Sequence, residues 1–406
     1  MAEATEPLAE APEERDRWLL LLTVLLVGFG LLMVLSASQA LSINQNRSPF
    51  YYFIRQAALI GAGVAAMLVL RRLDYHRLRR FAPAAAGLVL LLMLLVLVPG
   101  IGVDVNGARR WFNAGPLGSF QPSEIGKLVF AVFLAHWIDK RDERLHSLAD
   151  GLVPFAIMLG AVLALLMLQK DLGSALIITA IFISIYFSAG GSHVHLALLL
   201  VGLLVLFLLF TTLESYRSQR LATFLHPFRD PLGTGFQSTQ SILALGSGGF
   251  SGVGLGHSVQ KYLWLPEAHT DFIFAIVGEE TGLIGTTLVL LGFVLFAVRG
   301  YRAAMRAPDR FGVILAVGIT TWIAFQALIN MGTVTDTLPI TGVPLPFISY
   351  GGTSVAVTLA AVGVLLNIAG QGGRQTLRRS DATLDIGRGD RRPRLPGARR
   401  RASVPR

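Results

Sequence analysis

Residues 18–36 read WLLLLTVLLVGFGLLMVLS, a run without a charged side chain. A helix needs about 20 apolar residues to cross the hydrocarbon core of a bilayer, so this run predicts a membrane span. The whole chain has the same character, because 53% of its 406 residues are hydrophobic and only 15% are charged. We therefore expect an integral membrane protein. No small-residue cleavage site follows the run, so we expect it to be retained rather than removed as a signal peptide.

Nine further apolar runs, separated by polar loops, predict an all-α membrane protein with ten transmembrane helices. The membrane domain then covers residues 18–370, between a cytoplasmic N-terminal segment (1–17) and a basic tail (371–406). The nine further spans are predicted at residues 53–70, 81–99, 123–138, 152–168, 172–189, 196–212, 272–298, 312–331 and 352–369.

Lysine and arginine fix the expected orientation. They are dense in the loops 71–80, 139–147 and 298–310, which fall on one side together with the N-terminus. Cytoplasmic loops carry such an excess, so both termini are predicted to be cytoplasmic. The tail 371–406 is rich in arginine and poor in apolar residues, so we expect it to be disordered and solvated, with contact to anionic lipid as the alternative. The net charge of +10 then reflects topology and does not indicate nucleic acid.

The longest outer segment, residues 213–271, joins the seventh and eighth spans. Loops of this length inside a compact fold are usually functional. Residues 236–245 are amphipathic and predict a short helix along the membrane interface. The sequence GSGGFSGVGLG (246–256) lacks the spacing of a nucleotide-binding loop, so its glycines are expected to let the backbone turn sharply or approach a ligand closely. Cysteine is absent, which excludes disulfides and thiol nucleophiles.

The end of this segment, LPEAHTDFIFAIVGEE (265–280), brings ionisable groups to the entrance of an apolar span. Asp271 is predicted in the first turn of the eighth span, where a carboxylate caps a helix and complements its dipole. Partial burial in an apolar cavity would instead favour a role as a general base. The residue alone leaves both roles open. Glu279 and Glu280 lie deeper in the span and must face protein or water.

Two other outer segments carry charge. Arg109 and Arg110 precede Trp111, a composition that suits a phosphate ligand or an interfacial anchor equally well. Glu124 and Lys127 lie three residues apart at the start of the fourth span, where an ion pair is expected. That pair either locks the span to a neighbour or lines a polar cavity. Asp171 and the proline-rich loop 339–354 are expected to form other walls of the same cavity.

Five motifs in these segments resemble the SEDS family, which comprises the FtsW, RodA and SpoVE proteins. They are NGARRWFNAGPLGSFQPSEIGK, QKDLGSA, GFQSTQSILALGSGG, LPEAHTDFIFAIVGEE and PLPFISYGGTS, and the resemblance runs from about residue 18 to 370. The family implies a ten-helix peptidoglycan glycosyltransferase that polymerises lipid II outside the cytoplasmic membrane. Residues 216–237 and 254–271 are more similar to the division proteins than to RodA.

The resemblance implies roles for particular residues. The essential aspartate of the family falls on Asp271, which would activate the acceptor sugar hydroxyl, with Glu267 and His269 as support. The glutamate and lysine of the family's fourth span fall on Glu124 and Lys127, which would line the cavity together with Asp171.

The leaving undecaprenyl pyrophosphate needs positive charge. The expected ligands of the pyrophosphate and sugar are Arg109, Arg110, Arg217, Arg220, Lys261, Gln237, Gln240 and Ser349. A divalent cation, Mg or Mn, is an alternative source of charge, but the sequence shows no HxxxH motif, so no metal ligands are assigned and no cofactor is certain.

The implied partners are lipid II, a class B penicillin-binding transpeptidase and other divisome membrane proteins, with no nucleic acid. The implied location is the bacterial cytoplasmic membrane, enriched at the septum. Three alternatives remain from the sequence: a RodA-like elongation polymerase, a lipid II flippase, for which intramembrane charges would also be suitable, and a scaffold that recruits a transpeptidase.

Overall fold

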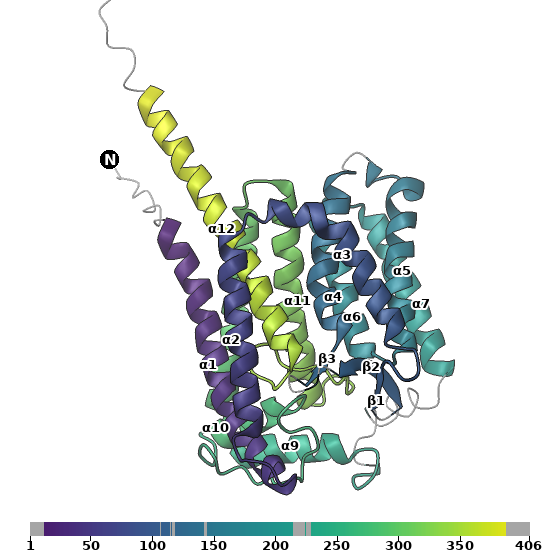
Figure 1. Cartoon of the computed structure of the whole chain (residues 1–406), viewed down its shortest axis with the longest axis vertical. Coiled ribbons are helices and arrows are strands. Elements are labelled where there is room, and N and C mark those ends of the chain that lie inside the picture. Colours follow the sequence, from purple (N-terminus) through teal and green to yellow (C-terminus); the bar gives the residue numbers. More distant parts are fainter. Residues whose placement is uncertain are drawn as a thin grey trace, which may run out of the picture.

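The computed structural model describes residues 12–105, 107–113, 115, 118–141, 144–213, 224 and 229–386. It is a bundle of long helices (Figure 1), and each of the ten predicted spans coincides with one of them. These helices are α1 (Pro12–Asn44), α2 (Tyr51–Arg72), α3 (His76–Leu95), α4 (Pro122–Asp139), α5 (Val153–Leu168, after a π-helical turn at Leu148–Leu152), α6 (Leu172–Ser188), α7 (His193–Leu213), α10 (Ile273–Met305), α11 (Arg310–Val334) and α12 (Thr353–Ile386).

Seven of the described helices are long and apolar enough to cross a membrane. The other three are α4, which carries charged residues, and α6 and α7, whose described apolar parts are shorter. The long helices that are visible in Figure 1 run roughly along the same direction. The predicted all-α membrane architecture is therefore confirmed in its helices.

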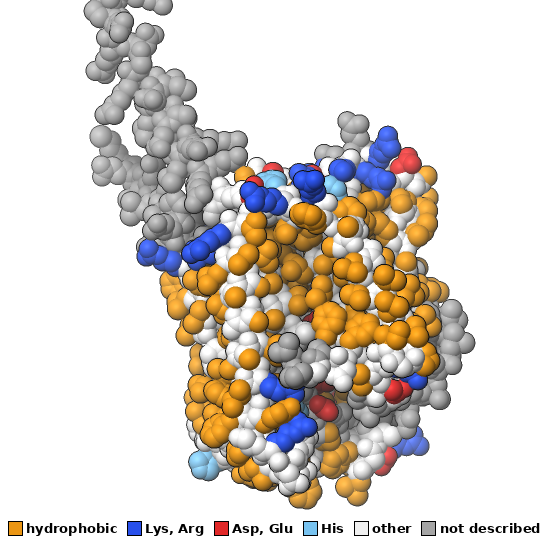
Figure 2. All heavy atoms as spheres, viewed as in Figure 1, with side chains coloured by type: hydrophobic (Ala, Val, Ile, Leu, Met, Phe, Trp, Pro, Cys, Tyr) orange, Lys and Arg blue, Asp and Glu red, His pale blue; other side chains and the backbone are white. Residues whose placement is uncertain are grey.

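The two chain ends lie at the same end of the bundle. The start of α1 and the end of α12 both point there in Figure 1, and many Lys and Arg side chains gather at that end in Figure 2. This arrangement agrees with the predicted cytoplasmic side. Helix α12 continues to Ile386, and the rest of the tail lies outside the described residues, so the disorder expected for residues 371–406 stays a prediction.

The opposite, outer end contains a small sheet that the all-α prediction missed. Strands β1 (Val103–Val105), β2 (Ala108–Asn113) and β3 (Ser119–Phe120) pair antiparallel in the order β1-β2-β3. Helix α9 (Phe236–Gly248) lies across the same end (Figure 1) and confirms the predicted short helix at 236–245.

Helix α11 lies at the centre of the bundle, and 67% of its most apolar stretch is buried inside the protein. Small residues allow its neighbours to approach closely. A Cβ on Gly318 would lie 2.7 Å from Ile185 of α6, and a Cβ on Gly300 of α10 would lie 2.4 Å from Thr320 of α11. Close packing of this kind replaces the hydrophobic effect as the force between helices inside a membrane.

Helix α10 is interrupted at Gly282, whose φ of 65° and ψ of −162° are not helical. The glycine-rich segment 249–254 lies against this break and supplies the backbone partners that the helix has lost. Four hydrogen bonds join them: Leu283 N to Gly249 O (3.0 Å), Ile284 N to Phe250 O (3.3 Å), Val253 N to Glu279 O (3.0 Å) and Gly254 N to Glu280 O (3.1 Å). The close backbone approach expected of these glycines is therefore to a broken helix.

We expect Gly282→Ala to lower the free energy of unfolding by about 2 kcal/mol or more, because a side chain at positive φ is strained. Its Cβ would also lie 2.4 Å from the backbone nitrogen of Gly252. Gly246→Ala is the matched control, since Gly246 lies within α9 and a Cβ there meets no heavy atom within 4 Å. Thermal unfolding in detergent measures both variants, and equal losses would contradict this account of the break.

Candidate functional site

Asp271 lies in the turn that precedes α10, two residues before the helix begins at Ile273. The cap residue of α10 is Phe272, one position after Asp271, and the Phe272 side chain forms no cap hydrogen bond. The Asp271 backbone carbonyl accepts a hydrogen bond from Asn330 Nδ2 at 2.7 Å. Its carboxylate is half-buried and faces the outer loop, 3.5 Å from where a Cβ on Gly342 would lie. The backbone of Asp271 is thus held by α11, while its carboxylate lies at the last outer loop.

His269 is buried in the same turn. Its ring lies 4.9 Å from the Tyr52 ring and 5.6 Å from the Tyr350 ring, between centroids. Its backbone carbonyl accepts a hydrogen bond from Tyr350 N at 3.0 Å. Glu267 is exposed and has a φ of 54°, and its carboxylate accepts a hydrogen bond from Thr270 Oγ1 at 2.7 Å. Both predicted supporting residues therefore shape the turn that carries Asp271.

Burial lowers the pKa of His269, and the Coulomb effect of Glu267 opposes only part of this change. The unfolded chain takes up a proton below about pH 6.5, whereas the buried ring does so only at lower pH, so stability should fall as the pH decreases below about 6.5. We expect His269→Gln to flatten this dependence in thermal unfolding between pH 7 and 5. His257→Gln, in the exposed part of the same loop, should leave it unchanged. Parallel curves for wild type and His269→Gln would contradict the assignment.

Glu124 and Lys127 form a buried ion pair of 2.6 Å at the outer end of α4. Lys127 Nζ also donates to Gln326 Oε1 of α11 at 2.9 Å, and Trp322 Nε1 donates to the same oxygen at 2.8 Å. Gln326 Nε2 donates to the backbone carbonyl of Pro344 at 2.9 Å. The pair therefore locks α4 to α11 and to the last outer loop. Glu124 Oε2 is buried with no hydrogen-bond partner among the described residues.

Arg109 and Arg110 of strand β2 both bind groups of the protein itself. Arg110 donates to the carbonyls of residues 169 and 170, at 3.2 and 2.8 Å, and lies 3.9 Å from the carboxylate of Asp171. Asp171 caps α6 through the backbone N–H of Ser174 at 3.1 Å. Arg109 forms an ion pair of 3.3 Å with Asp104. Arg110 thus braces the connection between α5 and α6, and a phosphate role for either arginine stays a prediction.

Lys261 is buried and lies 3.0 Å from Glu280 Oε1. Its ammonium also donates to Ser36 Oγ at 3.0 Å and to a glycine carbonyl of residue 256 at 2.6 Å. Glu279 accepts a hydrogen bond from the backbone N–H of Val259 at 2.9 Å. These contacts hold the loop 252–261 against α10, which accounts for both glutamates deep in the span. The predicted pyrophosphate role of Lys261 would require it to leave this ion pair.

The predicted sugar ligands are dispersed. Gln237 Nε2 donates to the Pro266 carbonyl at 3.5 Å, and Gln240 is half-buried on α9. Ser349 is buried, and its hydroxyl accepts a hydrogen bond from Leu345 N at 2.7 Å. Arg217 and Arg220 lie outside the described residues. Within the described ranges, no three His, Asp or Glu side chains are grouped to hold a metal ion.

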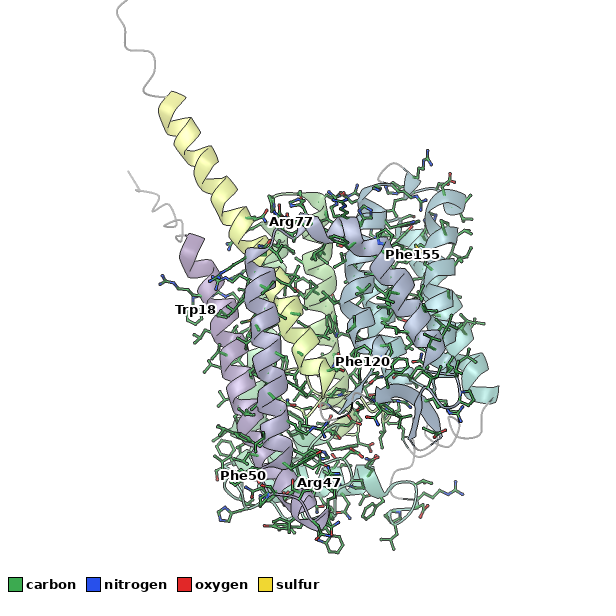
Figure 3. All side chains as sticks on the ribbon, in the orientation of Figure 1. Trp18, Arg47, Phe50, Arg77, Phe120 and Phe155 are labelled. Carbon is green, nitrogen blue, oxygen red and sulfur yellow. The ribbon has the colours of Figure 1, made fainter. Side chains whose placement is uncertain are left out.

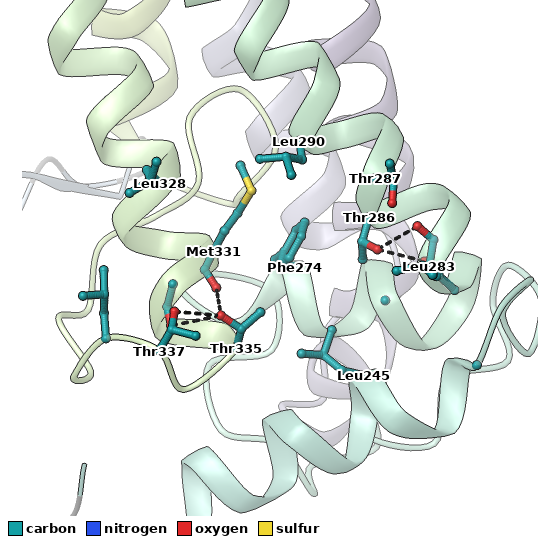
Figure 4. Close-up of a pocket in the computed structure, with 15 residues that line it drawn as sticks. Leu245, Phe274, Leu283, Thr286, Thr287, Leu290, Leu328, Met331, Thr335 and Thr337 are labelled. Carbon is teal, nitrogen blue, oxygen red and sulfur yellow. Dashed lines mark hydrogen bonds between the residues drawn. The ribbon is translucent and has the colours of Figure 1, made fainter. Parts of the chain in front are cut away.

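A pocket of about 640 Å³ lies between α9, α10 and α11 (Figure 4). Three of its threonines donate their hydroxyls to nearby backbone carbonyls: Thr286 to Gly282 O at 3.2 Å, Thr335 to Met331 O at 2.9 Å and Thr337 to Gly332 O at 3.0 Å. They therefore leave mainly methyl groups for the pocket, beside Phe274 and several leucines. None of the predicted site residues lines it, so the cavity expected around Asp271 stays a prediction.

Sequence reasoning missed Gln326 and Asn330, which hold the loops of the site. Asn330 Nδ2 donates to both Asp271 O and Val343 O at 2.7 Å. The two residues are four positions apart in the apolar helix α11, so they share one helical face. Polar side chains at this spacing inside a predicted span were a signal that could have identified them.

The fold and the site together define a multi-pass membrane protein with a polar outer end. The buried Glu124–Lys127 ion pair, the half-buried Asp271 and the hydrogen-bonded Arg110 all lie there. The chain belongs to the FtsW/RodA/SpoVE family, whose model, described as a cell cycle protein, matches residues 17–372. The family resemblance of the motifs is therefore confirmed.

Relatives and solved structures agree with this assignment. A probable peptidoglycan glycosyltransferase FtsW of Geobacter metallireducens is 44% identical over 359 residues, which are 88% of this chain and 95% of the relative. Stage V sporulation protein E of Bacillus subtilis is 42% identical over 355 residues, 87% of this chain and 96% of the relative.

Among solved structures, RodA of Thermus thermophilus matches with a TM-score of 0.63 and 30% identity, over 86% of this chain and 95% of that one. A chain from work described as "Structural coordination of polymerization and crosslinking by a peptidoglycan synthase complex" matches with a TM-score of 0.70 and 31% identity. That match covers 87% of this chain and 97% of the other.

Proposed function

We propose that this chain is a peptidoglycan glycosyltransferase that polymerises lipid II at the outer face of the cytoplasmic membrane and works at the division septum. Relatives named FtsW at 44% and 43% identity support a division role over a RodA-like elongation role, since the matched RodA is 30% identical. A flippase or a scaffold has no comparable support among these relatives.

The observation that carries the proposal is the placement of Asp271. Its carboxylate stands half-buried at the outer end of the bundle, in a turn that is held by Asn330 and lies just before the start of α10. In the proposed reaction the 4-hydroxyl of one lipid-linked disaccharide attacks the anomeric carbon of the growing chain. Asp271 takes the hydroxyl proton as the new glycosidic bond forms, and undecaprenyl pyrophosphate leaves with the electron pair of the broken bond.

Both substrates are anchored in the bilayer by polyprenyl tails, so a site at the membrane surface aligns them and removes much of the entropy of encounter. We further propose a class B penicillin-binding transpeptidase as partner, supported by the matched peptidoglycan synthase complex. We also propose other divisome membrane proteins as partners. A divalent cation, Mg or Mn, is the alternative source of positive charge for the leaving pyrophosphate.

The test is a polymerisation assay with the purified full chain, its class B transpeptidase and labelled lipid II. We expect glycan chains on a gel when the chain is present and none with the transpeptidase alone. Movement of labelled lipid II across a vesicle membrane without polymer would indicate a flippase. Neither polymer nor movement would indicate a scaffold and would overturn the proposal.

A further inference from the structure

Arg47 and Arg55 flank one tyrosine at the outer end of α2. The guanidinium carbon of Arg47 lies 4.3 Å from the Tyr51 ring centroid, and that of Arg55 lies 5.3 Å from it. Arg55 also donates to the Tyr51 hydroxyl at 2.7 Å. Figure 3 labels Arg47 at this end of α2, and Figure 2 shows Lys and Arg side chains on the same part of the surface. The result is two positive groups on one aromatic side chain.

These two arginines differ in their ion pairing from the cations that were predicted as pyrophosphate ligands. The described members of that set are paired with acids: Arg109 with Asp104, Arg110 with Asp171, and Lys261 with Glu280. Across the described residues, neither Arg47 nor Arg55 forms an ion pair with an Asp or Glu side chain. Two like charges held together repel one another, and an anion beside them would relieve this repulsion.

Arg55 also reaches the loops of the Asp271 site. Its guanidinium lies beside Gly118, the residue before β3, where a Cβ would be 2.2 Å from Nη2. The next residue, Gln56, donates to the carbonyl of Ser349 at 3.0 Å and so ties this turn of α2 to the last outer loop. That loop contains Gly342, which borders the Asp271 carboxylate. Arg55 Nε is buried with no hydrogen-bond partner among the described residues, so one donor is unused.

We propose that Arg47 and Arg55 form the pyrophosphate site of the lipid-linked substrate. Guanidinium groups bind phosphate oxygens in a bidentate manner, and an arginine keeps its charge at the membrane surface. In the reaction, Arg55 stabilises the negative charge that develops on the leaving pyrophosphate, while Asp271 accepts the proton of the attacking hydroxyl. This inference rests on the proposed function and names the groups that hold its substrate.

A measurement of lipid binding tests the proposed pyrophosphate site directly and does not require catalytic turnover. The full chain in nanodiscs is titrated with undecaprenyl pyrophosphate, undecaprenyl phosphate and undecaprenol, and native mass spectrometry measures the bound lipid. We expect Arg55→Gln and Arg47→Gln to bind the pyrophosphate at least tenfold more weakly than wild type, and Arg55→Lys to lie between. Arg229→Gln removes the same charge from an exposed outer residue and should change binding less than twofold. Undecaprenol should bind equally to all variants.

Two outcomes would overturn the site: wild-type affinity for the pyrophosphate in Arg55→Gln, or an equal loss for undecaprenol, which would mean a general defect. Thermal unfolding of each variant shows whether the protein is folded, and Arg55→Lys keeps the charge if the glutamine variant is not. The outcome of this binding experiment can be distinguished from the outcome of the polymerisation assay. If wild type makes no polymer but binds undecaprenyl pyrophosphate through these arginines, the enzyme proposal fails and the binding site stands.

Discussion

Replacing Lys127 with methionine is expected to lower the free energy of unfolding by about 3–5 kcal/mol, because it leaves a buried charge without its partner. Lys127 is 0% exposed and Glu124 is 4% exposed, so water cannot take the place of the lost ammonium. The substitution also removes the donor to Gln326 Oε1 and loosens the connection from α4 to the last outer loop. Thermal and denaturant unfolding in detergent, together with polymerisation, measure the loss.

The double variant Glu124→Gln/Lys127→Met distinguishes the contribution of the ion pair to stability from the contribution of side-chain packing. It removes the uncompensated carboxylate, so it should be more stable than Lys127→Met alone. Lys140→Met makes the same change on the exposed end of α4 and should alter stability by about 0.5 kcal/mol or less. A double variant as unstable as the single one would show that the ion pair is not what locks α4 to α11.

The ten spans could be predicted because the bilayer fixes the length and polarity of a crossing helix. The predicted span 272–298 starts one residue before α10 and otherwise lies within it, because the broken helix is still one apolar run in the sequence. The small sheet could not be predicted, since β3 has two residues and β1 three, too few to show an alternating pattern. Its strands are held by local pairing at the outer end, for which the sequence offers no periodic signal.

The site was only partly predictable. Asp271 and the Glu124–Lys127 pair came from motif and spacing, but the position of Asp271 before the helix depends on the hydrogen bond from Asn330, a contact across 59 positions in sequence. Which cations carry an acidic partner is equally a property of the fold. Arg110 was predicted as a phosphate ligand from composition, but it is hydrogen-bonded to the turn before α6. No motif in the sequence indicates Arg55, whose contact with Tyr51 appears only in the fold.

Replacing Asp271 with asparagine is expected to abolish polymerisation with little effect on stability. Asparagine has the same shape, and the hydrogen bond from Asn330 goes to the backbone carbonyl, which is kept. General base catalysis contributes about 10²–10⁴-fold, so the rate should fall at least about 100-fold. Asp336→Asn is the matched control, because Asp336 lies in the next outer turn with a φ of 54°, a conformation that asparagine tolerates.

The most direct measurement of the central claim is therefore glycan synthesis from labelled lipid II by wild type, Asp271→Asn and Asp336→Asn, each with the same class B transpeptidase and at the same folded concentration. The account predicts polymer from wild type and Asp336→Asn, and at least about 100-fold less from Asp271→Asn. Polymer from Asp271→Asn at the wild-type rate would contradict it.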